Sequence, residues 1–302
     1  MDLWSILVRG GIVNYYIQYP IYIDCQLRCP YCFHAERFKH NLLDGPNFEW
    51  EKYIKWRNTH LENAEDIIMH FHGGEPSTDL NQKLLKLIMP KFDKERFDFL
   101  SNGLGDDYGF IKEHKDRIHR VGFTYHRKVI KDNKDLQRKF INNVCSLKDF
   151  GLNVYVKELL FTDLRNEIAI DRHGWGELGV PHKIQDFKGY AKGEDFSEFT
   201  KYTPQDIAVI DTEYKHDPPI CECMRGYKTV IIRGGWQGGD ILGCWIDPVI
   251  VGSIHHNTYN PNYTAEITPH KGLEIVGVEK NYAGTYIRDR EFESRNYISP
   301  NL

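Results

Sequence analysis

Short apolar runs alternate with longer amphipathic stretches over the first two thirds of the chain. Each apolar run ends in polar or turn-forming residues, and the stretches between the runs have the spacing of helices with one apolar face. This alternation is typical of successive βα units whose strands form a parallel sheet. The runs that we interpret as strands cover residues 21–23, 67–71, 97–100, 120–125, 153–161 and 183–187.

The stretches between these runs predict helices at residues 48–61, 81–89, 108–117 and 134–149. Spacing alone fits either an open doubly wound sheet or a barrel of βα units. In both architectures ligands collect at the carboxyl ends of the strands. The residues that directly follow each strand are therefore the expected site of the chemistry.

The chain changes character two thirds of the way along. Residues 189–219 are polar and rich in turn-forming residues, which predicts a boundary between domains of residues 1–200 and 201–302. In the second domain, short strands at residues 229–232 and 240–242 flank a glycine-rich turn, a pattern typical of a β-hairpin. The rest of this domain has no repeat and no predicted role.

Composition and charge narrow the class of protein. A chain of 302 residues with 41% hydrophobic and 27% charged residues can bury a large core, which excludes wholesale disorder. The 39 basic and 43 acidic side chains give a net charge of -4. This balance does not favour a nucleic-acid partner, although a local basic groove would not show in the sum.

The sequence also indicates the cellular compartment of the protein. No apolar run approaches the roughly 20 residues of a membrane-spanning helix. Residues 1–15 include Asp2 and Arg9 and lack the apolar core of a signal peptide. We therefore expect a cytoplasmic protein without a membrane partner.

The seven cysteines divide into two trios and the single Cys145. The first trio is Cys25, Cys29 and Cys32, with C-x3-C-x2-C spacing directly after the first predicted strand. In a reducing compartment, clustered thiols indicate metal or redox chemistry more often than disulfides. A [4Fe–4S] cluster that only transfers electrons uses four protein ligands, so three cysteines leave one iron open. Zinc is the alternative, with His34 as its fourth ligand, but zinc sites generally use two separated ligand pairs.

The first trio and a second motif resemble the signature of the radical S-adenosylmethionine (radical SAM) enzymes. In the trio, the aromatic Tyr31 directly precedes the third cysteine, and the second motif, Gly73-Gly74-Glu75-Pro76, follows the second predicted strand. The resemblance implies a partial (β/α)6 barrel in which the three cysteines hold a [4Fe–4S] cluster as the catalytic centre. It also implies that S-adenosylmethionine (AdoMet) binds the open iron. AdoMet would be cleaved reductively to a 5′-deoxyadenosyl radical, which takes a hydrogen atom from the substrate.

The resemblance further implies which residues contact AdoMet. Tyr31 would lie near the adenine, and residues 73–76 would hold the methionyl amino group, because glycines allow close approach and Glu75 complements a positive charge. Lys157 is the candidate partner for a carboxylate, since Glu158 lies on the opposite face of the same strand. Three more candidates follow the third strand or end the fourth: Asn102, Thr124 and His126. For these three, an ordinary turn or capping role is an equal alternative.

The second trio is Cys221, Cys223 and Cys244, in which Gly239 and Cys244 have G-x4-C spacing. This trio resembles the opening of the twitch and SPASM extensions, which attach auxiliary iron–sulfur clusters to a radical SAM barrel. No cysteine follows Cys244, so the resemblance implies at most one auxiliary [4Fe–4S] cluster, in a small extension that contains the hairpin. A zinc site is the alternative. The fourth ligand is open among Cys145, Asp247, His255, His256 and the substrate.

We therefore expect a radical SAM enzyme that acts on a small molecule or a peptide and receives electrons from a donor such as flavodoxin or ferredoxin. Residues 1–24 are too few for a peptide-recognition domain, so recognition of a peptide is expected from a separate partner or from the tail. Radical modification of a nucleobase, or of a nucleobase-linked amino acid, is one alternative. A non-catalytic binding protein with two structural zinc sites is the other.

Overall fold

A computed structural model describes residues 13–20, 24–32, 50–186, 227–232, 239–242 and 250–260 of the chain. Six strands run parallel, and each pairs with the next in chain order. They are β1 (Val13–Pro20), β2 (Ala64–His72), β3 (Glu95–Ser101), β4 (Ile118–Tyr125), β5 (Val154–Leu160) and β6 (His182–Asp186). The predicted α/β class with a mostly parallel sheet is confirmed.

Four further strands continue the sheet on the other side of β1. The strand β7 (Tyr227–Ile232) pairs with β1 in parallel. The strands β8 (Asp240–Leu242), β9 (Ile250–Ser253) and β10 (Thr258–Tyr259) follow it in antiparallel pairs. The hairpin predicted at residues 229–232 and 240–242 is confirmed as β7 and β8. It extends the main sheet, whose order is β10-β9-β8-β7-β1-β2-β3-β4-β5-β6.

The helices described are α3 (Trp50–His60), α4 (Asp79–Ile88), α5 (Gly109–Glu113), α6 (Arg127–Ile130), α7 (Lys134–Asp149) and α8 (Arg165–Glu177). Short 3-10 turns accompany them: η1 (Met89–Lys91), η2 (Lys115–Arg117) and η3 (Thr162–Leu164). None of these helices is long and apolar enough to cross a lipid bilayer.

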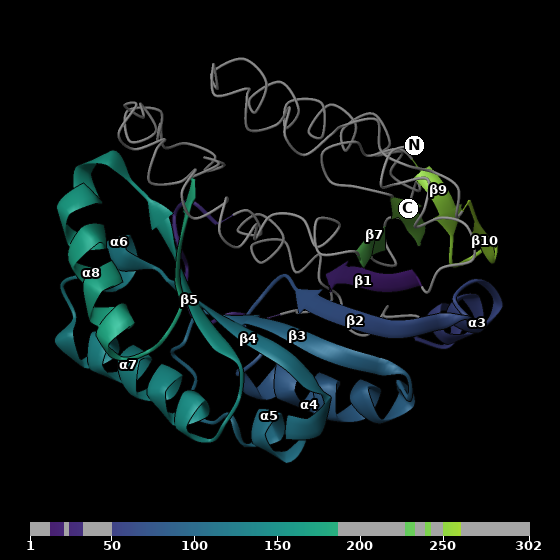
Figure 1. Ribbon diagram of the computed structural model, residues 1–302, viewed down its shortest axis with the longest axis horizontal. Coiled ribbons are helices and arrows are strands. Elements are labelled where there is room, and N and C mark those ends of the chain that lie inside the picture. Colours follow the sequence, from purple (N-terminus) through teal and green to yellow (C-terminus); the bar gives the residue numbers. More distant parts are fainter. Residues whose placement is uncertain are drawn as a thin grey trace, which may run out of the picture.

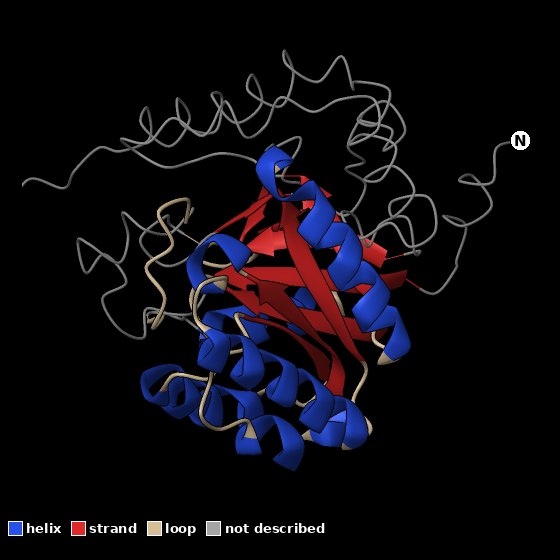
Figure 2. Cartoon of the chain, turned by 90° about the vertical axis from the view of Figure 1, so that its left-hand side faces the viewer, coloured by secondary structure: helices blue, strands red, loops and turns tan. Residues whose placement is uncertain are grey.

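The sheet is curved, and α4, α5, α7 and α8 line its outer side (Figure 1). In the view turned by 90°, the described helices lie below and in front of the strands (Figure 2). A doubly wound sheet has helices on both faces and reverses its strand order, whereas β1 to β6 follow one another without reversal. The described part of the chain is therefore a singly wound, curved α/β sheet. Its closure into a partial barrel stays a prediction.

Some described elements, among them β1 and α8, are not among those predicted from the sequence. The strand predicted at residues 21–23 lies outside the described residues, and β1 occupies the segment before it. Consecutive side chains of β1 are buried, among them Tyr15, Tyr16 and Ile17, so the alternation that marks a half-buried strand is absent. Helix α8 is not among the predicted helices, because two glycines and the exposed Ile170 interrupt its apolar stripe. The boundary predicted near residue 200 also lies outside the described residues.

Apolar side chains fill the space between the sheet and the helices. On β2, β3 and β4, alternate side chains pack into this core, and the rings of Phe71, Phe97, Phe99 and Phe123 in it are fully buried. The rings of Phe71 and Phe97 stack at 5.7 Å, and Phe123 meets Phe140 of α7 edge-on at 6.1 Å. This aromatic layer holds the helices on the outer side and leaves the inner side of the sheet for polar groups.

A polar cluster occupies the inner face of β1 to β4. Asp98 accepts hydrogen bonds from Tyr16 Oη at 2.5 Å and from Arg120 Nη2 at 2.8 Å. His70 Nδ1 lies 3.5 Å from the same carboxylate oxygen. Burial alone would raise the pKa of Asp98, but Arg120 and His70 outweigh it and hold this pKa below its ordinary value. Asp98 therefore remains charged on the inner face of the sheet.

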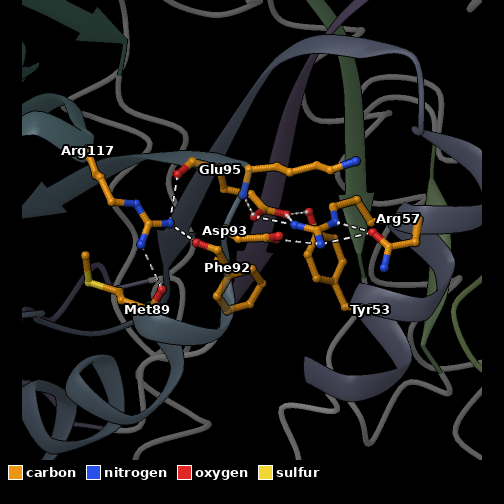
Figure 3. Close-up of polar contacts among 9 residues, drawn as sticks. Tyr53, Arg57, Met89, Phe92, Asp93, Glu95 and Arg117 are labelled. Carbon is orange, nitrogen blue, oxygen red and sulfur yellow. Dashed lines mark hydrogen bonds and ion pairs between the residues drawn. The ribbon is translucent and has the colours of Figure 1, made fainter.

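A buried ion pair joins α3 to the start of β3 (Figure 3). Arg57 Nη1 donates to both carboxylate oxygens of Glu95, at 2.9 and 2.8 Å, and Tyr53 Oη donates to Oε1 at 2.8 Å. Arg57 and Glu95 are each 2% exposed. On the other side, Arg117 donates to the backbone carbonyls of Met89 and Glu95, both at 3.1 Å. Charges this deeply buried are tolerated only as a pair.

We expect Glu95→Gln to lower the free energy of unfolding by about 3–5 kcal/mol, because Arg57 would keep its charge without its buried partner. Chemical denaturation of the variant and the wild type measures the difference. Asp135→Asn is the control, since Asp135 and Arg138 form an exposed pair and its loss should cost less than about 1 kcal/mol. Equal denaturation curves for Glu95→Gln and the wild type would contradict this prediction.

Candidate functional site

The loop that carries the first cysteine trio begins against the Gly-Gly-Glu-Pro segment. The backbone N–H of Glu75 donates to the carbonyl oxygen of Asp24 at 2.8 Å. Thr78 caps helix α4, and this places Asn81 in the first helical turn. The Asn81 side chain donates to the carbonyls of Asp24 at 2.8 Å and Glu75 at 2.7 Å. The two motifs are therefore joined at the carboxyl ends of β1 and β2.

The carboxylate of Glu75 connects the end of β2 to the end of β3. It is 1% exposed, and its Oε1 accepts hydrogen bonds from Ser77 N at 3.0 Å, Ser77 Oγ at 2.6 Å and Ser101 Oγ at 2.8 Å. Its Oε2 accepts from Asn102 N at 2.5 Å. Burial raises the pKa of Glu75, and these hydrogen bonds act against that rise. The Glu75 side chain therefore points toward the end of the neighbouring strand.

Asn102 contacts the first cysteine. Its Nδ2 lies 3.6 Å from Cys25 Sγ, within hydrogen-bond range for sulfur. Its Oδ1 accepts from Gln26 Nε2 at 3.1 Å and from the backbone N–H of Leu104 at 2.9 Å. The asparagine predicted at the end of the third strand thus lies against the cysteine loop.

The three thiols of the loop form no disulfide and differ in exposure. Cys29 is buried, whereas Cys25 and Cys32 are partly exposed. Burial raises the pKa of the Cys25 and Cys29 thiols to about 12, and Glu75 adds to the rise at Cys25. Metal binding at this loop would therefore release protons. In the described ranges, no three His, Cys, Asp or Glu residues lie close enough together to hold a single metal ion.

Tyr31 anchors the far end of the loop. Its ring is 6% exposed and lies between His126, with ring centroids 6.0 Å apart, and Phe161, with centroids 5.4 Å apart. Its hydroxyl is 3.3 Å from His126 Nδ1. Burial and then the charge of Lys157 lower the pKa of His126 to about 4. His126 is therefore neutral at physiological pH.

The remaining predicted contacts lie at neighbouring strand ends. Thr124 is buried and faces Lys157 in the register of β4 and β5. Glu158 lies on the other face of β5, where it is fully buried and accepts from Arg127 Nε at 2.6 Å. Gly73 has a φ of 125°, a conformation that side-chain-bearing residues rarely adopt. Gly74 is partly buried and Pro76 is buried. The structure thus brings the predicted AdoMet contacts to the same edge of the sheet as the cysteine loop.

Comparison with known proteins bears on the fold. No protein-family model matches the sequence, and no curated protein is similar enough in sequence to count as a relative. The structure is similar to that of anSMEcpe with bound AdoMet, a radical SAM sulfatase-maturating enzyme, with a TM-score of 0.51 and 14% identity over 81% of this chain and 75% of that one. It is also similar to Streptococcus suis SuiB bound to the precursor peptide SuiA, with a TM-score of 0.51 and 15% identity over 93% and 69%.

The chain shares its α/β fold, with a mostly parallel sheet, with anSMEcpe and SuiB. The partial (β/α)6 barrel expected from the cysteine loop and the Gly-Gly-Glu-Pro segment stays a prediction. At these levels of identity the likeness concerns the fold alone, and the activity rests on the residues of the site.

The second trio, Cys221, Cys223 and Cys244, and also Asp247, lie outside the described residues, so their roles stay predictions. Two of the candidate fourth ligands lie far apart. Cys145 is on α7, which packs against β5. His255 follows β9 and packs against the hairpin, since a Cβ on Gly239 would be 2.4 Å from His255 Cδ2. His255 therefore lies beside the hairpin, whereas Cys145 does not.

Several residues that hold the site together are not among the sequence predictions. Ser77, Asn81 and Ser101 bind Glu75 or Asp24, and Tyr108 Oη lies 2.8 Å from Ser101 Oγ. The position of Ser77 and Ser101 next to strand ends is a weak signal in the sequence. No signal distinguishes Asn81, because an asparagine in the first turn of a helix is common.

We expect the stability of the wild type to fall as the pH drops from 6.5 toward about 4, partly because of His126. Its pKa in the folded chain lies below the ordinary value, so protonation favours the unfolded chain. His126→Gln should remove part of this fall, as measured by thermal unfolding at a series of pH values. His173→Gln, at an exposed position on α8, should keep the wild-type profile. A His126→Gln profile identical to the wild type would refute the prediction.

Proposed function

We propose that the chain is a radical SAM enzyme that binds a [4Fe–4S] cluster through Cys25, Cys29 and Cys32 and modifies a peptide. The observation that carries the proposal is the joining of the cysteine loop to the Gly-Gly-Glu-Pro segment by Asp24, Glu75 and Asn81. A structural zinc loop has no need of this second segment. A cluster with one open iron does, because its ligand must be held beside it.

The side chains of the loop fit a cluster. Thiolates are the usual ligands of iron–sulfur clusters, and the loop carries three cysteines at C-x3-C-x2-C spacing. Asn102 supplies an N–H donor to one sulfur. Cluster and AdoMet together would supply reductive cleavage of AdoMet and hydrogen-atom abstraction from the substrate.

The residues around the loop suit an amino acid ligand such as the methionyl part of AdoMet. Gly73 and Gly74 have no side chains, so a ligand can approach their backbone closely. The buried carboxylate of Glu75 favours a cation nearby. Lys157 offers a positive charge to a carboxylate, while the neutral His126 offers a hydrogen bond without repelling Lys157.

One observation supports a peptide substrate. The structurally similar SuiB is bound to its precursor peptide SuiA.

We also propose that Cys221, Cys223 and Cys244 hold an auxiliary [4Fe–4S] cluster, with His255 as the candidate fourth ligand. The contact of His255 with Gly239 supports this choice, because Gly239 lies between the second and third cysteines of the trio.

The purified protein should be brown when prepared without oxygen and should contain about 4 irons per chain for each cluster. With dithionite it should convert AdoMet to 5′-deoxyadenosine. Replacing Cys25, Cys29 and Cys32 by alanine should abolish this product, because the open iron would be lost.

Two variants sharpen this experiment. Cys145→Ala removes a thiol on α7 that belongs to neither trio, and it should keep the iron and the activity. A Cys221, Cys223 and Cys244 triple alanine variant should lose only the iron of the second cluster. A colourless zinc protein that forms no 5′-deoxyadenosine would refute the proposed function.

A peptide substrate carrying deuterium at the attacked carbon should transfer deuterium into 5′-deoxyadenosine, because the abstracted hydrogen becomes part of that product. Mass spectrometry of the nucleoside measures the transfer. The same peptide without deuterium is the control. Transfer from labelled small molecules, with none from any labelled peptide, would contradict the peptide assignment while leaving the enzyme class in place.

A further inference from the structure

The side chain of Asn102 has an orientation that its neighbours determine. Amide oxygen and nitrogen look alike, and their assignment depends on the hydrogen bonds around them. The backbone N–H of Leu104 can only donate, and it lies 2.9 Å from Oδ1. The oxygen must therefore face Leu104, so the nitrogen Nδ2 faces Cys25 Sγ at 3.6 Å.

Hydrogen bonds to Glu75 also fix the backbone around Asn102. Its N–H donates to the buried Glu75 carboxylate at 2.5 Å, and the preceding residue, Ser101, donates to the other oxygen at 2.8 Å. The following residue, Gly103, has a φ of 73° and donates to Ser101 Oγ at 3.0 Å. A Cβ at Gly103 would be 2.4 Å from the Phe140 ring, so the backbone of Gly103 packs closely against this ring of α7. Asn102 is thus a rigid donor rather than a mobile surface side chain.

We propose that Asn102 is a positioning residue for Cys25: its amide N–H donates to Sγ and keeps this sulfur in the orientation that a cluster requires. The inference rests on the proposed function. It differs from the role expected from the sequence, in which Asn102 contacts AdoMet. Glu75 supports the same contact, because its carboxylate holds the backbone from which the Asn102 side chain extends.

A hydrogen bond to a ligating sulfur has two consequences. It withdraws electron density from the thiolate, which makes a bound cluster easier to reduce, and it orients the ligand and slows its loss. Partners in this position typically change metal affinity or activity by about 10- to 100-fold when they are removed. Removing the Asn102 amide should therefore shift the reduction potential to more negative values and speed iron loss.

Asn102→Ser should keep one contact of the side chain, with the backbone N–H of Leu104, and remove the other, with Cys25 Sγ. A serine hydroxyl can still accept from the backbone N–H two residues later, as in many turns, but its shorter side chain does not reach Cys25. Asn143→Ala is the matched control. The Asn143 side chain donates to the carbonyls of Gly103 and Gly105 in the same loop, at 2.9 Å each, and does not contact the cysteine.

The experiment uses the full chain with the cluster reconstituted anaerobically. Two quantities are measured for each variant: the midpoint potential of the cluster by redox titration with electron paramagnetic resonance, and the rate of iron loss to a chelator. We expect Asn102→Ser to have a more negative potential and an iron-loss rate about 10- to 100-fold higher. Asn143→Ala should match the wild type in both quantities.

The possible failures are distinguishable. A wild type that holds a cluster, with unchanged potential and iron loss in Asn102→Ser, would overturn the role of Asn102 and leave the proposed function intact. Equal shifts in Asn102→Ser and Asn143→Ala would also overturn it, because the effect would then come from the loop as a whole. A wild type that binds no cluster would overturn the proposed function and this inference together.

Discussion

The buried carboxylate of Glu75 is the interaction on which the rest of the site depends. A carboxylate that is 1% exposed is costly unless donors surround it, and here Ser77, Ser101 and Asn102 supply them. These donors come from the ends of two different strands, so satisfying one charge also sets the distance between the two ends. Asn102 then extends this constraint to the first cysteine.

The two faces of the sheet divide structural and functional tasks. The outer face is a continuous layer of aromatic rings against the helices, which stabilises the strands and holds their register. The inner face carries a charged cluster around Asp98, and the cysteine loop lies where the same strands end. Because the carboxyl ends of parallel strands meet at one edge, residues distant in sequence form one site. Tyr31 secures the loop on the β4 and β5 side through His126 and Phe161.

Most regular elements are predictable from the chain because their patterns are local. Helix α7 has the predicted bounds, Lys134 to Asp149, since an asparagine cap and a clear apolar stripe mark it. Strand β1 is harder to predict, because it lies between β2 and β7 and consecutive side chains along it are buried. The place of the hairpin beside β1 depends on the pairing of β1 with β7, two strands that lie far apart in the sequence. Pairings of this kind leave no periodic signal in the sequence.

The sequence by itself predicted the kind of chemistry: cysteine spacing and the Gly-Gly-Glu-Pro segment each indicate a candidate site from a few adjacent residues. It also determined the α/β class, since alternation of apolar runs is a local property. Only the tertiary structure decided that the helices cover one face, that the hairpin continues the sheet, and that the Glu75 carboxylate and the Asn102 amide point toward β3 and Cys25. Side-chain direction at a strand end depends on which donors the neighbouring strands present, and that information exists only once the strands have paired.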